Sequence, residues 1–520
     1  MLAVGLALNM RRYNREKVDV VRECTIDIGT SKQLFIDSKW FQSQRGMTLT
    51  VNPPVKSDIV LSPGKPWDDI AIYAYSNVLE HEGLYKMWYD GLSNLPAGKN
   101  HGRCVCYAES RDGVDWQRVN VNLFEWEGIR DNNIVMPGAS AGVMIDPNGP
   151  DEQRYKALCI IHENEVWPES KGAVTGYFEG EKFVARLELY LCTSPDGIHW
   201  TRQSTPVSNY FHDTQNHFFY DTRLKTYAGY FRTHQRGRSV GRLEIDDPMA
   251  LPWIPLNEGH PGAGRFFTTV LESDEMDPPD SDLYTPCVHQ YPWAADAYFS
   301  FTTPYRHYAV GDTSDTTLQG HDGRGRFRND GPVDIQLAVS RDGIRFTRPD
   351  RRPYVALGLQ GAWDGGQTYM CLGMIRRGDE VWMFDAPTRR THGAYEPGRM
   401  EPEKGLRRLV QRLDGFVSAD AAFDGAEFTT PLLKVSGAYP KLNIDCSAMG
   451  QAWVEIRDEK NHPIPGYTLA DSIDIDRNQI AAPVLWREKA NVAELIGKPI
   501  SLHFKLRACK LYAFQFDDEP

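Results

Sequence analysis

The chain has 520 residues, 41% of them hydrophobic, which is enough to bury one large core and a smaller one. Its formal net charge is −12, and its lysines and arginines are scattered along the sequence. Nucleic acids and anionic membranes need clustered cations, so we expect neither as a partner. The 24 Tyr, 22 Phe, 44 Gly and 33 Pro are typical of many short strands joined by turns, which predicts an all-β protein.

The nine cysteines are odd in number and stand singly inside apolar runs, so we expect reduced, buried thiols. Cys104 and Cys106 share one face of a predicted strand, but no second Cys/His pair at metal-ligand spacing accompanies them. The first residues, MLAVGLALNMRR, place their charges after the apolar run, which reverses the order of a signal peptide. We therefore expect no metal site, and a cytoplasmic protein unless a leader has been removed.

In chain order, residues 1–64 contain one clear strand pattern, KQLFIDSKWF, which is predicted to cap or complete the next domain. Residues 65–430 then contain five units of about four strands each. In each unit an apolar stretch and a polar turn precede an alternating aromatic strand, as in YKMWYDG, YKALCIIH, KTYAGYFR, AYFSFTTPYRHY and DEVWMFDAP. Repeated all-strand units of this size predict a five-bladed β-propeller.

A Ser-x-Asp-Gly-x-x-aromatic turn recurs at Asp112-Gly113, Asp196-Gly197 and Asp342-Gly343. The spacing between the second and third copies is about twice that expected, and a degenerate copy, Asp246-Asp247, fills the gap. We expect the Ser and Asp side chains to bind the turn's own amides, the Gly to relieve backbone strain, and the aromatic residue to pack between blades. The turn is therefore predicted to be structural, and not catalytic.

From Pro431 the blade pattern stops, and residues 431–520 contain short strands spaced as in a β-sandwich. The predicted fold is therefore a five-bladed β-propeller followed by a C-terminal β-sandwich.

Acids and amides stand at the start of nearly every predicted innermost strand, where the blades of a propeller converge on a central funnel. Carboxylates around a sugar-sized hole are what cleavage of a glycosidic bond requires. The candidate catalytic residues are Asp213, Asp282, Asp364 and Glu275. The candidate substrate-binding residues are Asn216, Tyr284, Trp363, Asp37, Arg232, His289 and His392. The alternative interpretation is that polar residues at strand starts only cap the sheet ends.

The turns RDGVDW and PDGIHW, the stretches LFIDSKW, DTQNHFFYD and DLYT, and the terminal sandwich resemble distant relatives of glycoside hydrolase families 32 and 43. The resemblance implies an Asp nucleophile or base, a second Asp that positions or tunes, a Glu acid in a middle blade and, in some members, a calcium ion in the channel. The chain departs from family 32, because its Asp-Pro-Asn-Gly, Asp146–Gly149, reads as a hairpin turn. The sequence does not indicate which residue would be the general acid.

These observations predict a glycoside hydrolase that acts on an oligo- or polysaccharide, at a chain end, with no required cofactor. The alternative is a propeller that binds glycans without cleaving them. A protein-interaction scaffold is a third reading, which the acidic and aromatic funnel disfavours. The sequence leaves open the sugar, the linkage, the stereochemical outcome and the oligomeric state.

Overall fold

The computed structural model describes residues 25–94, 103–162, 176–179, 182–185, 187–208, 210, 212–234, 237–256, 262–309, 317–319, 326–393 and 401–520. The N-terminal run MLAVGLALNMRR lies outside the described residues. The described part contains strands and short 3-10 helices but no α-helix, so the all-β prediction is confirmed. Accordingly, none of its helices has the length and apolar character needed to cross a membrane.

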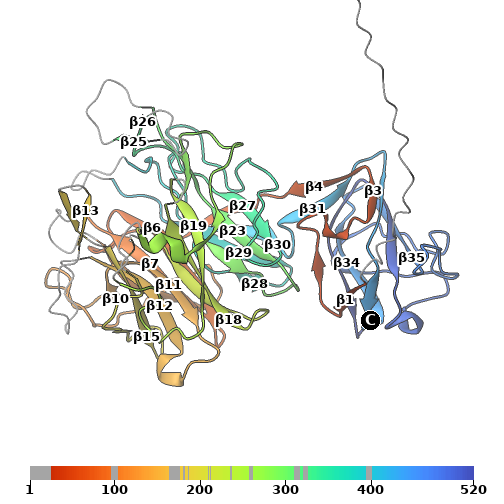
Figure 1. The fold of residues 1–520 in the computed structure, drawn as a ribbon, viewed down its shortest axis with the longest axis horizontal. Helices are drawn as coiled ribbons and strands as arrows, with labels where there is room; N and C mark the ends of the chain where they lie inside the picture. Colours follow the sequence, from red (N-terminus) through yellow and green to blue (C-terminus); the bar gives the residue numbers. More distant parts are fainter. Residues whose placement is uncertain are drawn as a thin grey trace, which may run out of the picture.

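Figure 1 shows a larger part, coloured orange to cyan, beside a smaller blue part that also contains the first, red strands. The first sheet of the larger part has the order β10-β8-β7-β6, with β9 beside β8, and the second has the order β11-β12-β15-β16. Their strands are β6 (Ala71–His81), β7 (Leu84–Leu92), β8 (Arg103–Ser110), β9 (Gln117–Arg118), β10 (Ile134–Pro137), β11 (Ala139–Ile145), β12 (Tyr155–His162), β15 (Leu187–Ser194) and β16 (Thr201–Arg202).

Three further sheets follow, with the orders β17-β18-β19-β20, β22-β23-β27 and β28-β29-β30-β5. Strand β5 precedes the first sheet in sequence and forms the outer edge of the last, so the two ends of the larger part meet in one sheet. The strands are β17 (His217–Asp221), β18 (Thr226–Thr233), β19 (Ser239–Ile245), β20 (Thr268–Leu271), β22 (Val288–Gln290), β23 (Tyr298–Thr302), β27 (Gln336–Ser340), β28 (Ile375–Arg377), β29 (Glu380–Asp385), β30 (Leu406–Arg412) and β5 (Val55–Leu61).

Three two-stranded pairs accompany these sheets in the larger part. They are β13 (Gly176–Glu179) with β14 (Lys182–Ala185), β21 (Ser281–Leu283) with β24 (Pro304–Arg306), and β25 (Thr317–Gln319) with β26 (Arg326–Arg328). The 3-10 helices of the described residues are η1 (Ser38–Trp40), η3 (Asp151–Gln153), η4 (Gly262–Phe266) and η5 (Ala493–Leu495).

The innermost segments of the five sheets contact one another in chain order and close into a ring. A parallel bridge between Asn77 and Leu372 joins the last sheet to the first. The remaining junctions are the bond from the Val143 amide to Asn77, the approach of Gly142 to Asn216, the bond between His217 and the Val288 carbonyl, and the bond from the Gly373 amide to His289. A Cβ on Gly142 would lie 2.4 Å from the Asn216 carbonyl oxygen, so a larger residue there would push two sheets apart.

The three Asp-Gly turns have the structure that their sequence predicts. Gly113, Gly197 and Gly343 have φ of +77°, +82° and +70°, which glycine adopts without strain. In each turn the Ser hydroxyl accepts a bond from the glycine amide, and the Asp carboxylate accepts from the next two amides.

Each turn also packs against the second strand of the preceding sheet. For the turn of the first sheet, the preceding sheet in the ring is the last one. Trp88 donates to the Gly197 carbonyl at 2.7 Å, and the Tyr230 hydroxyl donates to the Gly343 carbonyl at 2.8 Å. The aromatic residues of the turns pack in the same way, since Trp116 lies 6.0 Å from Phe384 and Trp200 lies 6.5 Å from Trp88. The predicted structural role of the turn is therefore confirmed.

The smaller part has one sheet of order β36-β34-β38-β31-β4, with β2 beside β38, and a second of order β3-β32-β37-β35. Strand β1 pairs with β33 in parallel. The strands are β1 (Ile26–Gly29), β2 (Gln33–Leu34), β3 (Ser43–Arg45), β4 (Met47–Val51), β31 (Val417–Ala421), β32 (Ala426–Thr429), β33 (Leu433–Val435), β34 (Tyr439–Asp445), β35 (Gln451–Arg457), β36 (Asn478–Pro483), β37 (Ser501–Arg507) and β38 (Cys509–Asp517). Strand pairing thus places residues 26–51 and 417–429 with the C-terminal strands, while the boundaries at 64 and 431 stay sequence-based predictions.

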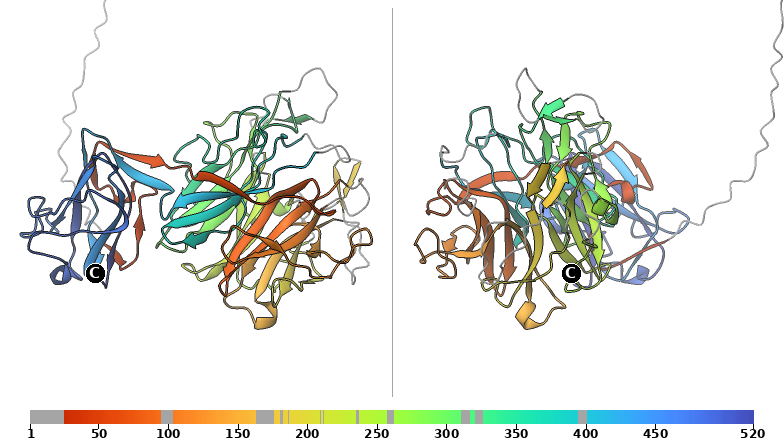
Figure 2. Two further views of the ribbon diagram at one scale, coloured as in Figure 1. Left: turned by 180° about the vertical axis from the view of Figure 1, so that it is seen from behind. Right: turned by 60° about the vertical axis from the view of Figure 1, so that its left-hand side comes forward.

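The two parts share a hydrophobic core and several ion pairs, and the chain crosses between them after β4 (Figure 2). Arg341, which follows Ser340 in the third Asp-Gly turn, binds Asp37 at 2.9 Å and Asp296 at 2.7 Å. Lys39 also pairs with Asp296, at 2.6 Å. The same turn that packs one sheet against its neighbour therefore also holds the N-terminal segment.

The eight cysteines in the described part are all free and buried, as predicted. The Sγ atoms of Cys104 and Cys106 lie 3.5 Å apart on one face of β8.

Candidate functional site

Tyrosines gather at the end of the ring where the innermost strands begin. This aromatic cluster consists of Tyr73, Tyr75, Tyr284, Tyr305, Tyr369 and His392. Tyr284 lies 5.6 Å from Tyr305 and 5.9 Å from Tyr369 in edge or tilted contacts, and His392 lies 4.7 Å from Tyr284. Burial raises the pKa of Tyr73 and Tyr75, so their hydroxyls stay protonated and able to donate as well as accept hydrogen bonds.

Arg232, on β18, stacks on this cluster from within the core. Its side chain is 1% exposed, its guanidinium carbon lies 3.9 Å from the centre of the Tyr284 ring, and its Nη2 donates to the Tyr284 carbonyl at 3.1 Å. The Nε atom has no hydrogen-bond partner among the described residues. Arg232 therefore supplies a fixed positive charge at the floor of the cluster.

Asp213 lies beside Arg232, just before β17. Its side chain is 43% exposed, and one carboxylate oxygen lies 3.9 Å from Arg232 Nη1. Burial raises the pKa of both Tyr73 and Tyr75, and the charge of Asp213 adds to this effect. Asp213 is thus a carboxylate that solvent reaches, next to aromatic rings and a buried cation.

Asp282, on β21, borders the same cluster but has a different environment. Its side chain is 10% exposed, and it accepts bonds from Arg238 Nη1 at 2.6 Å and His307 Nε2 at 3.0 Å. Burial on its own raises the pKa of this carboxyl, but the bonds and charges of His307 and Arg238 outweigh it and hold the pKa well below its usual range. Asp282 is therefore held ionised, and it positions Arg238, whose guanidinium lies 5.3 Å from the Tyr284 ring.

The structure brings four of the predicted site residues together in this cluster, namely Asp213, Arg232, Tyr284 and His392. Burial and the charges of Arg238 and Arg232 lower the pKa of His392 to about 3, so the ring is neutral at pH 7. Its Nδ1 lies 2.7 Å from the Tyr369 hydroxyl. Asn216 stands immediately behind, fully buried, where it accepts a bond from the Arg232 amide and donates to the backbone of its own loop.

Four other predicted residues lie outside the cluster, and three of them have their partners elsewhere. Asp364 pairs with Arg407 at 2.8 Å and with Lys56 at 3.3 Å, and the Trp363 ring lies 5.3 Å from the Arg407 guanidinium. Asp37 binds Arg341 between the two parts of the molecule. Glu275 is exposed, in the loop before β21.

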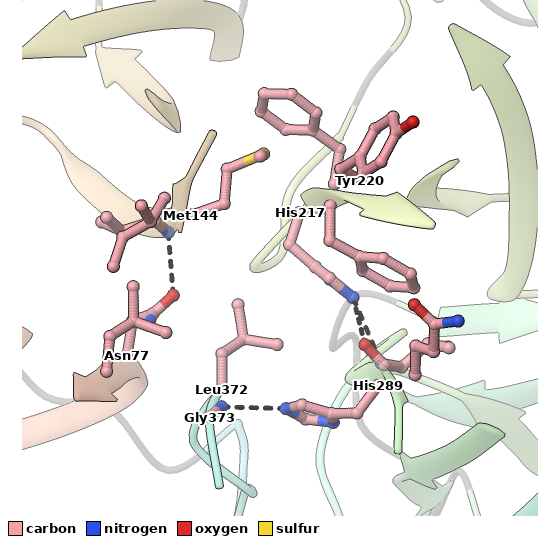
Figure 3. Close-up of a pocket in the computed structure, with 14 residues that line it drawn as sticks. Asn77, Met144, His217, Tyr220, His289, Leu372 and Gly373 are labelled. Atoms are coloured by element: carbon pink, nitrogen blue, oxygen red, sulfur yellow. Dashed lines mark hydrogen bonds between the residues drawn. The ribbon is translucent and has the colours of Figure 1, made fainter. Parts of the chain in front are cut away.

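The remaining predicted residue, His289, lies on β22 outside the aromatic cluster, and Figure 3 shows it among the residues around a cavity. Its Nε2 accepts a bond from the Gly373 amide at 2.8 Å. It lines a cavity there together with His217 and Asn77.

Tyr73, Tyr75 and Tyr305 belong to the cluster, and Arg238 lies beside it, but all four are missing from the sequence-based candidates. The first two stand in the stretch IYAYSN, where alternate tyrosines begin an innermost strand, and this pattern was the available signal. Tyr75 has φ of +77° inside an irregularity in the pairing of β6 with β7. A bulky residue held in this region marks a strained position of the kind that collects at functional sites.

The described donors do not fit the calcium ion that the family resemblance implies. Within the described residues no group of three or more His, Cys, Asp or Glu side chains is placed to hold a metal. Among the described residues, the polar side chains along the innermost strands include Gln215, Asn77 and His217. Calcium prefers several oxygen ligands that include carboxylates, which this set lacks.

No family model matches the chain. A protein of Mycobacterium tuberculosis (strain CDC 1551 / Oshkosh), "Uncharacterized protein MT1551", is 25% identical over 177 residues, which cover 30% of this chain and 48% of that protein. The chain thus matches about half the length of this curated relative.

The chain also resembles solved structures of glycoside hydrolases, as the sequence resemblance predicted. An exo-inulinase from Aspergillus awamori is 11% identical, with a TM-score of 0.39 over 90% of this chain and 99% of that one. A thermostable family-43 glycoside hydrolase is 14% identical, with a TM-score of 0.38 over 69% and 94%. A protein of the GH130 family of mannoside phosphorylases and glycoside hydrolases is 13% identical, with a TM-score of 0.41 over 75% and 99%. Likeness at this level says nothing about substrate, which has to come from the site.

Proposed function

We propose that the chain is a glycoside hydrolase whose active site is the aromatic cluster with Asp213. In this proposal the ring of five sheets is a five-bladed β-propeller and the smaller part is a β-sandwich. The contacts between innermost segments in chain order, and the closure of the last sheet by β5, support the blade count.

The observation that carries the proposal is the setting of Asp213. A sugar ring has apolar faces that pack on aromatic rings and hydroxyls that bind to tyrosine, arginine and carboxylate groups. Asp213 is 43% exposed and lies among such groups, so its carboxylate can reach a bound sugar. A carboxylate in this position acts as the nucleophile, or as the base that activates water.

The ring closes beneath the cluster, which supports action at a chain end. The side-chain amide of Gln215 donates to the carbonyls of Ser76 and Ala141, at 3.2 Å and 3.3 Å. These bonds tie three innermost segments together directly behind the cluster. A site with a closed floor accepts the last sugar of a chain more readily than a sugar in its middle.

A second function, glycan binding without cleavage, is favoured by the state of the other carboxyl groups. Hydrolysis by paired carboxyl groups also needs one that is protonated, to donate to the leaving oxygen. The pKa of Asp282 and of Asp364 is lowered, because the bonds and charges of their cationic partners outweigh the effect of burial. Both are therefore poor proton donors, and Glu275 stands in an exposed loop. Neither function needs a cofactor.

The experiment that tests the proposal is a screen of the wild-type protein against aryl glycosides of arabinofuranose, fructofuranose, xylose, fucose and galactose. Turnover of at least one substrate is expected. Each corresponding free sugar is titrated calorimetrically in parallel. Saturable sugar binding without turnover of any glycoside would replace hydrolysis with glycan binding, and the absence of both would overturn the carbohydrate assignment.

A further inference from the structure

The innermost strands enclose a second, separate site at their far end. A cavity of about 300 Å³ lies there, lined by β6, β11, β17, β22 and the segment before β28 (Figure 3). Gln215 precedes the lining residue His217 in its segment, and its hydrogen-bond partners Ser76 and Ala141 precede the lining residues Asn77 and Val143 in theirs. These three linked residues therefore lie between the cavity and the aromatic cluster. The cavity is therefore not a deeper part of the proposed active site.

Apolar side chains make up most of the cavity wall. Phe218, Phe219, Leu372, Leu79 and Met144 are among them, and none of the described residues that line the cavity carries a charge. Cavities of about 300 Å³ or more, apolar with a few placed polar groups, are typical of sites for small molecules. The volume also exceeds what a few buried waters occupy, at roughly 30 Å³ each.

Three buried polar atoms of the lining have no hydrogen-bond partner within the described part of the chain. They are Asn77 Nδ2, His217 Nδ1 and His289 Nδ1. Asn77 is 1% exposed and His217 is 4% exposed. Buried polar groups in proteins are nearly always bonded, so three in one cavity indicate partners that come from outside the protein.

The bonds made by the opposite atom of each side chain fix what the free atom can do. Asn77 Oδ1 accepts from the Val143 amide, which leaves Nδ2 as a donor. His217 Nε2 lies 2.8 Å from the Val288 carbonyl oxygen and 3.3 Å from the Val288 amide nitrogen. The shorter contact favours the tautomer with the proton on Nε2, and in that tautomer the neutral ring presents Nδ1 as an acceptor. His289 Nε2 accepts from the Gly373 amide, so its Nδ1 carries the proton and is a donor.

Both histidines are neutral at pH 7. Burial lowers the pKa of His217 to about 4, and burial together with the neighbouring His217 lowers the pKa of His289 to about 3. The three unpartnered atoms thus offer two donors and one acceptor, and none of the three side chains is charged.

We propose that this cavity binds small neutral molecules that combine an apolar ring or chain with a hydroxyl group. A hydroxyl donates one hydrogen bond and accepts up to two, so it can use an acceptor and donors of this kind. The apolar body of the ligand packs against the phenylalanines and leucines. An anion or a cation meets no opposite charge in the lining. The inference stands whether or not the chain hydrolyses glycosides.

The test uses phenol as the probe, with toluene and benzoate as matched compounds, and ligand-observed NMR as the readout. Phenol should bind saturably, toluene about fivefold to tenfold more weakly because it lacks the hydroxyl, and benzoate not detectably. In protein labelled with 15N-histidine, phenol should shift the signals of the two unpartnered Nδ1 atoms. Equal binding of phenol and toluene, or no saturable phenol binding, would overturn the proposal.

A pair of variants at Leu79, a partly buried lining residue, locates the binding. Leu79→Trp should fill the cavity and abolish the phenol signal, while Leu79→Met, similar in volume, should keep it. Binding that persists in a folded Leu79→Trp protein would place the phenol elsewhere and would contradict the proposal. Should Leu79→Trp not fold, the 15N shifts of the wild-type histidines decide the question alone.

Discussion

The two ends of the innermost strands differ sharply in chemistry although they belong to the same segments. At one end Asp213, Arg232 and Arg238 lie beside tyrosines in edge and tilted contacts, and at the other His217 and His289 line a cavity with no charged side chain among its described lining residues. A strand rises about 3.3 Å per residue, so the change from Asp213 to His217 takes only a few residues of one segment. Residues only a few positions apart on one innermost segment therefore belong to two separate sites.

A similar contrast separates the two carboxylates of the aromatic cluster. Asp213 is 43% exposed with a single cation 3.9 Å away, whereas Asp282 is 10% exposed and fully bonded to Arg238 and His307. An exposed carboxylate is free to act on a ligand. A buried one with two partners stabilises the structure and positions those partners.

The first way to break this contrast is Asp282→Asn, which should lower the free energy of unfolding by about 3 kcal/mol, since it leaves Arg238, whose side chain is 16% exposed, without a full counter-charge. Urea unfolding followed by tryptophan fluorescence measures the change. The same substitution at Asp213 should cost less, about 1 kcal/mol, because its carboxylate is 43% exposed and lies 3.9 Å from Arg232, although the Arg232 side chain itself is only 1% exposed. Equal losses for the two variants would show that the carboxylates do not differ in role.

The second prediction compares the outer turns with a free turn. Gly197 and Gly83 both have positive φ, at +82° and +74°, so alanine strains the backbone equally at each. A Cβ at Gly197 would lie 2.6 Å from Trp88, whereas one at Gly83 meets nothing within 4 Å. Gly197→Ala should therefore cost about 1–2 kcal/mol more than Gly83→Ala in thermal unfolding. If the two variants melt together, the turn does not lock the sheets.

The third and smallest prediction concerns how His217, at the cavity, affects the stability of the protein at acid pH. Because burial lowers the pKa of His217 to about 4 from an unfolded value of 6.5, the unfolded chain binds more protons between these pH values. The stability that the neutral ring contributes is therefore complete above pH 6.5 and is lost as the pH falls toward 4. Between pH 6.5 and 5.5 the wild type should lose about 1 kcal/mol more than His217→Gln, in which the amide replaces the imidazole. Parallel pH curves for both proteins would contradict the assignment of a neutral, buried ring.

The sequence predicted those features that depend on local chemistry. The Asp-Gly turns form from residues within six positions, so their hydrogen bonds and their glycine conformation follow from the motif alone. Local pattern also identified three residues of the site, because each lies on or next to an inner strand or its neighbour. They are Tyr284, Arg232 and Asp213.

Long-range pairing is what the sequence did not reveal. Asp364 meets Arg407 and Lys56, and Asp37 meets Arg341, across separations that no local pattern encodes. The sequence also did not reveal the cavity, because His217 and His289 come from different sheets and become neighbours only when those two sheets pack side by side. The sequence pattern indicated which charged residues stand at strand ends. It did not indicate which of them form ion pairs in the folded chain.

The account depends most directly on Asp213, and the decisive measurement is kcat/KM of Asp213→Asn on the best substrate of the wild type, with Asp364→Asn as the matched control. An amide is nearly isosteric with the carboxylate but cannot act as nucleophile or base, so the rate should fall by a factor of about a hundred to ten thousand. Binding of the product sugar should stay within a few-fold, and Asp364→Asn, outside the cluster, should keep most of the activity of the folded protein. An Asp213→Asn protein that retains more than about a tenth of the wild-type rate would contradict the account.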